Sequence, residues 1–382
     1  MSDLKIFHEY TNLTYLKVTI DDFEIFSGDL MNLQVDQSFK SVGLLGKLEF
    51  KDTFDIFNNS VTTLNNTNIV KVSVKDFSQD SSIRTYRITN ISHRKFNERF
   101  RIVTLSLLDE VTYKLSQTHV DKFYNGDCAF GVKSLIESVC SKELEDNKLS
   151  IKATGNLESS KSNMLCNSSQ NCLEFIISKL AKYNLRFFQT RGEIYIKELK
   201  PSELTPLEFN FTDKTMNNKY IYKIFDRQQM TVSNLESPKT EIYRINGKNV
   251  NTSTKNLEDM KSEMILNQNI VDTSNLQNSS VKMNLQASLT EGQQKLKVFN
   301  DFINTNRMFI AVPGTLAGGN IDTVIKTTFN GLIGFSDLTT EGDTMNSGNY
   351  YVSGVSDLYI GEKYIQKLVL SRTENIQPRD LR

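Results

Sequence analysis

The sequence predicts a mainly β protein with a small α+β domain in its middle. Apolar and polar residues alternate through the first and last thirds of the chain, with a turn signal at roughly every tenth position. Between about Phe123 and Leu199 the apolar spacing changes to that of helices. A two-strand pattern in the first β region also recurs in the last one. These observations favour two related β domains flanking a different one.

The first β region extends from Leu13 to Ser116, where runs such as Tyr15–Ile20 and Ile69–Val74 alternate strictly. Turn residues separate the runs at Gly28-Asp29, Gly43 to Gly46 and Asn65-Asn66. This spacing is typical of an antiparallel barrel or sandwich.

The middle region predicts two helices and a hairpin. Apolar residues occupy one helix face at Val132, Leu135, Ile136, Val139 and Cys140. A second helix begins at Asn171, because Glu174 follows it at the spacing of a capping box. The strands Leu185–Gln189 and Glu193–Glu198 flank the turn Thr190-Arg191-Gly192.

Strands return after Pro201 and Pro206. Expected elements are strands at Lys219–Phe225, Thr240–Ile245 and Met308–Val312, and helical spacing over Leu285–Asn304. The segment Asn246–Ser280 is crowded with Asn, Ser, Thr and Lys, so it predicts a surface insertion, with a short helix near Leu257, Met260 and Met264.

An internal repeat relates the first β region of the chain to the last one. At one constant offset, Tyr86, Ile88, Ile91, Ser92, Glu98 and Phe100 match Tyr350, Val352, Val355, Ser356, Glu362 and Tyr364. Each copy reads as two strands joined by a polar turn, followed by Leu105 and Leu107 in one copy and by Leu368 and Leu370 in the other. The match predicts two related barrels, with a chance similarity of short hairpins as the alternative.

Charge and hydropathy exclude several function classes. Among the 382 residues, 45 Lys and Arg balance 45 Asp and Glu, so no charge excess favours nucleic acid or anionic membranes. The sequence has no apolar window of about 18 residues and no signal-peptide pattern at its start, so we expect a soluble, non-exported protein without a membrane-spanning segment.

Cysteines and histidines give no clear metal site. Cys128, Cys140, Cys166 and Cys172 contain no C-x-x-C pair, so buried free thiols are expected, with zinc or a disulfide as alternatives. His8, His93 and His119 lack metal-ligand spacing and are expected to be structural or exposed.

The sequence also lacks a catalytic constellation. The glycine-rich run Pro313–Gly319 has no Lys-Ser/Thr of a phosphate loop, and no G-x-S-x-G elbow occurs. Acidic pairs such as Asp21-Asp22 or Glu143 with Glu145 are expected to be solvated. We therefore predict no catalytic residue, no metal site, no cofactor and no enzyme activity.

The order of features resembles the central baseplate hub proteins of contractile-tailed bacteriophages, a family shared with the N-terminal regions of type VI secretion spikes. The resemblance rests on Gly46–Asp52, Ile69–Phe77 and Tyr86–Leu108, and in the last part on Leu296–Val312, Tyr350–Val355 and Gln366–Ser371. It spans most of the chain without an invariant signature, and the Asn246–Ser280 insertion has no counterpart in it.

The resemblance implies tube-type barrels at 1–118 and 204–382, flanking a small α+β domain at 119–203, with the polar insertion at about 246–280. It further implies a homotrimer whose six barrels form a pseudo-sixfold ring between a hexameric tail tube, or a tube initiator, and a trimeric central spike. Other baseplate proteins are possible partners. The location implied is the virion tail baseplate, assembled in the host cytoplasm.

Two readings from other classes stay open. One is a β-rich receptor- or carbohydrate-binding tail protein, although the chain has no Trp for a sugar platform. The other is a tail-associated peptidoglycan hydrolase, which the missing catalytic constellation disfavours.

Overall fold

Most strands of the protein join one large sheet. The computed structural model describes residues 15–39, 41–53, 55, 64–75, 81–96, 100–157, 159–161, 163–212, 223–227, 239–246, 249–256, 291–304, 307–313, 320–330, 348–360 and 363–373. The 13-stranded sheet has the order β14-β17-β20-β19-β3-β4-β7-β6-β5-β1-β2, and β18 pairs with both β19 and β13. Among the described residues no strand pair joins the two ends of this path, so closed barrels remain a prediction.

The first β region confirms the alternating pattern. Its strands are β1 (Tyr15–Ile20), β2 (Phe23–Ile25), β3 (Leu30–Ser38), β4 (Leu45–Asp52), β5 (Ile69–Lys75), β6 (Ser81–Lys95) and β7 (Arg101–Asp109). Inward residues such as Val18, Leu48 and Val70 are buried in one core cluster. Residues on the opposite faces are more exposed, as period-two patterning requires.

The alternation ends earlier than predicted. Strand structure was expected to reach Ser116, but a helix, α1 (Glu110–Gln117), follows Asp109 directly. The side chain of Asp109 caps it by accepting a hydrogen bond of 2.9 Å from the Thr112 amide. Because Val111 and Leu115 pack among the helices of the middle region, α1 contributes to that core.

The middle region is an α+β unit, as expected. Its elements are β8 (Lys122–Tyr124), α2 (Cys128–Val139), α3 (Ser141–Asp146), β9 (Ser150–Ala153), η2 (Ser159–Lys161), β10 (Met164–Cys166), α4 (Cys172–Ala181), β11 (Leu185–Gln189), β12 (Glu193–Glu198) and η3 (Pro201–Glu203). The predicted cap of α4 is confirmed, since the Asn171 side chain accepts from the Glu174 amide at 2.9 Å. The predicted hairpin is β11–β12, and β9 joins it in parallel to form a three-stranded sheet.

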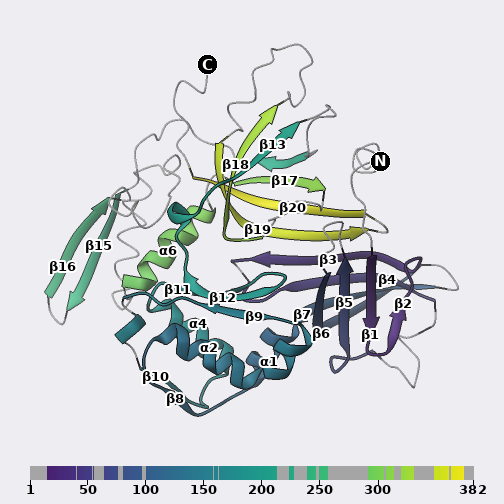
Figure 1. Ribbon diagram of the computed structural model, residues 1–382, viewed down its shortest axis with the longest axis horizontal. Coiled ribbons are helices and arrows are strands. Elements are labelled where there is room, and N and C mark those ends of the chain that lie inside the picture. Colours follow the sequence, from purple (N-terminus) through teal and green to yellow (C-terminus); the bar gives the residue numbers. More distant parts are fainter. Residues whose placement is uncertain are drawn as a thin grey trace.

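The last region contains β13 (Leu207–Thr212), β14 (Lys223–Arg227), β15 (Lys239–Asn246), β16 (Asn249–Asn256), α6 (Glu291–Asn304), β17 (Arg307–Pro313), β18 (Thr323–Asn330), β19 (Gly348–Ile360) and β20 (Lys363–Arg372). The predicted insertion begins with a strand, because β16 pairs with β15 along its whole length. This hairpin stands apart from the large sheet in Figure 1. The short helix expected near Leu257, Met260 and Met264 lies outside the described residues.

The large sheet contains the same strand arrangement twice. Strands β3, β4, β7 and β6 are neighbours in that order, and β14, β17, β20 and β19 repeat it. A fifth strand pairs antiparallel with the start of the last one in each set, β5 with β6 and β18 with β19. The five strands of each set also follow one another in the same order along the chain. We call β3–β7 the first unit, and β14 with β17–β20 the second unit.

Matching irregularities support this repeat. The pairing of β6 with β7 shifts at a bulge between Ile88 and Asn90, and that of β19 with β20 shifts between Val352 and Gly354. The bulged residues correspond at the offset found in the sequence. Their hydroxyl groups donate to matching carbonyl oxygens, Thr89 to Ser106 at 3.1 Å and Ser353 to Val369 at 3.2 Å.

The sequence match therefore coincides with equivalent hairpins. Its members Tyr86, Ile88, Tyr350 and Val352 are buried at the same places in the two hairpins. The matched Glu98 and Glu362 lie outside the described residues. The following leucines also correspond, because Leu107 pairs with Ile88 as Leu370 pairs with Val352.

Candidate functional site

The two units meet in a continuous strand pair. The end of β19 pairs antiparallel with β3, from Gly354 opposite Ser38 to Tyr359 opposite Leu33. The start of β19 pairs with β18 instead, so one long strand contacts a strand of each unit along the same edge. In Figure 1, β19 and β3 lie side by side between the upper and lower parts of the sheet. We call this strand pair the junction.

A buried ion pair fixes the middle region to the junction. The guanidinium of Arg191, in the turn between β11 and β12, binds both carboxylate oxygens of Asp357 on β19, with Nε to Oδ2 at 2.9 Å. The Asp357 side chain is only 1% exposed. It also accepts hydrogen bonds of 3.0 Å from the Tyr364 hydroxyl and from the Gln366 amide.

Arg84 joins the first unit to the same turn. This β6 side chain donates to the backbone carbonyl of Arg191 at 2.8 Å and also to that of Thr190. Burial lowers the pKa of Arg84, because the charged form loses its hydration. Two arginines therefore connect one turn of the middle region to a strand of each unit.

A second set of polar contacts holds the same hairpin. The Gln189 amide donates to the Asp109 carboxylate at 2.9 Å and to the Thr112 hydroxyl at 2.8 Å. Asp109 also accepts from the Leu44 amide at 2.9 Å. A Cβ atom at Gly43 would lie 2.1 Å from this carboxylate, so the close approach requires glycine there.

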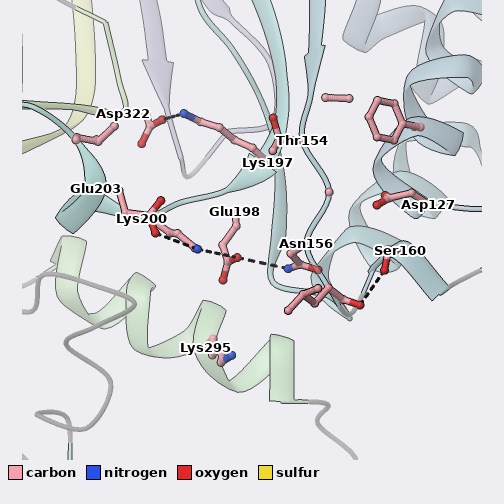
Figure 2. Close-up of a pocket in the computed structure, with 15 residues that line it drawn as sticks. Asp127, Thr154, Asn156, Ser160, Lys197, Glu198, Lys200, Glu203, Lys295 and Asp322 are labelled. Atoms are coloured by element: carbon pink, nitrogen blue, oxygen red, sulfur yellow. Dashed lines mark hydrogen bonds and ion pairs between the residues drawn. The ribbon is translucent and has the colours of Figure 1, made fainter.

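A groove lies between the middle region and α6, and Asp322 of the second unit also lines it. It has a volume of about 1000 Å³. Figure 2 shows Asp127, Asn156 and Ser160 along one side and Lys295 of α6 along another. Two exposed apolar side chains also line it, Phe130 at 54% and Leu157 at 89%.

Carboxylates in the groove are engaged in structural contacts. Asp127 caps α2 and accepts from the Ser159 hydroxyl at 3.1 Å. Asp322 forms an ion pair with Lys197 and accepts from Tyr351 at 2.8 Å.

The other two acids of the groove are also partnered. Glu198 accepts from Asn184 at 2.6 Å, and Glu203 pairs with Lys200 at 3.1 Å. Glycoside hydrolysis needs an acid and a second carboxylate facing substrate. All four carboxylates among the described residues that line the groove have a hydrogen-bond or ion-pair partner.

Among the side chains singled out in the sequence and described by the structure, Cys166 and Cys172 are neighbours, whereas both described histidines are exposed. All four cysteines are free and buried in the helical core, so the expectation of buried thiols is confirmed. His119 is exposed and its Nδ1 lies 3.1 Å from the Ser168 carbonyl oxygen. His93 is exposed on β6, while His8 and the run 314–319 lie outside the described residues.

The two acidic pairs singled out in the sequence lie on different elements. Asp21-Asp22 follows β1, and Glu143 with Glu145 belongs to α3. Asp21 lies in the turn after β1 with φ at +48° and accepts from the Ile69 amide at 2.8 Å. Within the described ranges no group of three or more His, Cys, Asp or Glu is placed to hold a metal ion. None of the helices described is long and apolar enough to cross a membrane.

Known proteins match this chain by structure rather than by sequence. No family model and no curated protein matches it. A tail protein from Neisseria meningitidis MC58 superimposes with a TM-score of 0.57 at 11% identity, covering 95% of this chain and 97% of that one. The 43 kDa tail protein of prophage MuSo2 from Shewanella oneidensis gives 0.56 at 9% identity, covering 94% and 98%. The E. coli c3393 protein, described as a component of the type VI secretion system, gives 0.44 at 8% identity, covering 94% and 77%.

The chain has the fold of bacteriophage tail proteins. Both tail proteins with the higher scores are covered almost completely, so the likeness extends over β regions and middle region together. The resemblance to phage tail and baseplate proteins stated from the sequence is confirmed at the level of the fold.

Proposed function

We propose that this protein is the structural hub of a phage tail baseplate. In this role a homotrimer forms a pseudo-sixfold ring that connects the hexameric tail tube, or a tube initiator, to a trimeric central spike. The observation that carries the proposal is the repeat of one five-strand unit within the chain, with matching bulges at Thr89 and Ser353. Three chains with two units each present six similar surfaces to a hexamer.

The arrangement of the units supports a ring. They are joined head to tail, because the last strand of the second unit in sheet order, β19, pairs with the first strand of the first unit, β3. Repeating a head-to-tail contact with a constant rotation produces a closed ring or a helix. Arg84, Arg191 and Asp357 also connect the two units through one turn of the middle region.

The proposal includes a division of the chain. Residues 1–118 and 204–382 form the two tube-type barrels, with α1 at the end of the first packing on the middle region. Residues 119–203 form the α+β domain, and the insertion at about 246–280 contacts the ring's surroundings, where other baseplate proteins lie. The protein works through buried apolar surface and strand edges, without bond chemistry, cofactor or sequence-specific nucleic acid. It is a component of the virion tail, assembled in the host cytoplasm.

Two other functions are weaker. A receptor- or carbohydrate-binding tail protein would use an exposed groove such as the one lined by Phe130 and Leu157. A tail-associated peptidoglycan hydrolase would need carboxylates free to act, whereas those of the groove are engaged.

Light scattering of the purified chain tests the hub, alone and with a spike protein from the same genome. We expect the mass of three chains in at least one condition. A monomer in both, without co-elution, would contradict the hub and favour a receptor-binding or peripheral role. Assays with purified peptidoglycan separate the other two functions, with a known hydrolase as the reference. Binding without cleavage would favour the binding protein, and cleavage would favour the hydrolase.

A further inference from the structure

Two of the four buried cysteines lie next to each other at the ends of two elements of the middle region. Cys166 is the last residue of β10, and Cys172 is the first residue of α4. Both side chains are 0% exposed and belong to the same core cluster. The two thiols are hydrogen-bonded to each other. Neither of them lines the groove or lies in the junction.

The connection between these cysteines is already held in place by other contacts. Residues 167–171 form a turn in which the Ser168 amide donates to the Asp121 carboxylate at 2.8 Å. At the end of the turn, the Cys172 amide donates to the Thr118 carbonyl oxygen at 2.8 Å, and Asn171 caps α4. A covalent link between the two sulfur atoms would therefore join backbone segments that the fold has positioned beforehand.

The other two cysteines make different contacts. The Cys140 thiol donates to the Val111 carbonyl oxygen at 3.8 Å, so it is engaged with the backbone of α1. Cys128 is the first residue of α2, on another element of the core. A disulfide needs sulfur atoms that can approach to bonding distance without backbone movement. The positions of the four thiols favour Cys166 and Cys172 as the pair that meets this requirement.

The two thiols differ in how readily they ionise. Burial raises the pKa of both, because the thiolate loses its hydration. The hydrogen bond between them raises the pKa of Cys166, the donor, and lowers that of Cys172, the acceptor. A backbone hydrogen bond at the start of α4 also lowers the pKa of Cys172. Since the thiolate is the reactive form, these contacts favour Cys172 as the nucleophile of the pair.

We propose that Cys166 and Cys172 form a disulfide bond when the folded protein meets hydrogen peroxide. The Cys172 sulfur attacks one peroxide oxygen, the O–O bond breaks, and a sulfenic acid and one water form. The Cys166 sulfur then attacks the sulfenic sulfur, the S–O bond breaks, and the S–S bond and a second water form. Two thiols are thus oxidised to one disulfide while one peroxide is reduced to two waters.

The setting for this oxidation rests on the proposed function, whereas the chemistry of the pair does not. A reducing cytoplasm keeps thiols reduced during assembly, and a virion that leaves the cell enters an oxidising environment. The disulfide would then link β10 to α4 in the finished particle. Because both cysteines are buried, we expect the bond to form slowly and without a change in the surface of the middle region.

Peptide mapping of the full-length chain tests the pairing. The folded protein is treated with hydrogen peroxide, the peroxide is removed, free thiols are blocked with iodoacetamide in urea, and the chain is digested with trypsin. Residues 162–179 form one tryptic peptide with both thiols, because neither Lys nor Arg lies between Lys161 and Lys179. We expect this peptide to lose two hydrogen atoms and remain unblocked. Peptides joined through Cys128 or Cys140 should be about tenfold less abundant.

Thermal melts show whether the bond fits the folded structure. The oxidised chain should melt about 3 °C higher than the reduced chain, because the disulfide restricts the unfolded state, and a reductant should abolish the difference. C140A is the matched control, since it removes a buried thiol outside the pair and should link as the wild type does. In C166A the sulfenic acid at Cys172 should be trapped by dimedone, whereas C172A should give about tenfold less adduct.

Three results would overturn the disulfide. The first is two blocked thiols in the 162–179 peptide after a treatment that oxidises the chain in urea. The second is a bond between Cys140 and Cys172, which would join two tryptic peptides. The third is a Cys166–Cys172 bond that lowers the Tm. Light scattering keeps this inference separate from the proposed function: a trimer with unlinked thiols would refute the disulfide alone, and a linked chain that stays monomeric with the spike protein would refute the hub alone.

Discussion

Arg191 and Asp357 form a bidentate ion pair across two regions of the chain, between a hairpin turn and the middle of the longest strand of the second unit. Asp357 lies opposite Val35 in the junction, so the ion pair acts where the two units are hydrogen-bonded to each other. The turn is held from the other side by Arg84 of β6. One short turn thus contacts both units beside the strand pair that joins them.

Asp357→Ala should therefore destabilise the protein strongly. It leaves Arg191, Tyr364 and Gln366 without their shared acceptor, and removing one partner of a buried pair costs about 3–5 kcal/mol. Since the Arg191 side chain is 29% exposed, we expect the free energy of unfolding to fall by about 3 kcal/mol, at the lower end of that range. Urea unfolding measures this loss. Glu137→Ala is the matched control, because it breaks the exposed ion pair with Lys133 within α2. It should lower the free energy of unfolding by only about 0.3 kcal/mol. Equal losses in the two variants would refute the structural role of the pair.

Substitutions at the two bulged residues, Thr89 and Ser353, should destabilise the protein to different extents. Ser353 is 5% exposed whereas Thr89 is exposed, although their hydroxyls make the same hydrogen bond. Ser353→Ala removes the contacts of a buried hydroxyl with the Val369 carbonyl and the Ser371 hydroxyl, and should lower the free energy of unfolding by about 1 kcal/mol. Thr89→Val should cost less than about 0.5 kcal/mol, because water replaces the hydroxyl. Urea midpoints measure both, and a larger loss at Thr89 would contradict the burial difference.

Lys197→Met should make the stability of the protein depend more strongly on pH. Burial raises the pKa of Asp322 above its usual value of 3.8, and the Lys197 ammonium and the Tyr351 hydroxyl oppose this. Without Lys197 the pKa rises further, so the folded state binds a proton more readily than the unfolded state does. The variant should therefore lose stability at about pH 7 and recover part of it as the pH falls towards 3.8, because the folded state binds its proton at a higher pH than the unfolded state.

Thermal melts of wild type and variant at about pH 7 and about pH 5 measure this change. Lys200→Met is the control, because its nearer partner Glu203, at 3.1 Å, is 62% exposed, and its other partner Glu198 lies 3.9 Å away. A Tm difference between K197M and wild type that does not narrow at the lower pH would show that Asp322 does not titrate as described.

The cysteines should react slowly in the native protein. Burial, followed by the neighbouring Cys172, raises the pKa of Cys166 to about 11. At about pH 8 only about one thiol in a thousand would then be ionised, compared with about a quarter for an ordinary cysteine. We expect an aromatic disulfide reagent that releases a coloured thiolate to label all four thiols in urea. Before unfolding it should label almost none of them. Fast labelling of the folded chain would contradict their burial.

Local structure was largely predictable because its causes are local. The cap at Asn171 and the hairpin around Arg191 follow from residues within a few positions of each other. The repeat was visible because the β6 and β19 hairpins retain apolar residues on both sides of a common bulge. Helix α1 was missed, since strand alternation continues up to its cap, Asp109.

The junction could not be predicted from the sequence. A charged residue in a turn, such as Arg191, normally indicates a solvated tip, and only the fold brings Asp357 to it. The equivalence of β14 with β3 was also hidden. The long segment between β14 and β17 separates strands whose counterparts, β3 and β4, are joined by a short connection. In neither case does a local pattern signal the contact.

The pairing of β3 with β19 also has a consequence for synthesis. Ser38 leaves the ribosome long before its partner Gly354 is made. At roughly 5–20 residues per second, the edge of β3 stays uncovered for tens of seconds in every nascent chain. During that time it can pair with other nascent chains on the same messenger. We therefore expect the yield of folded protein to depend on the rate of translation and on chaperones as well as on the stability of the finished fold.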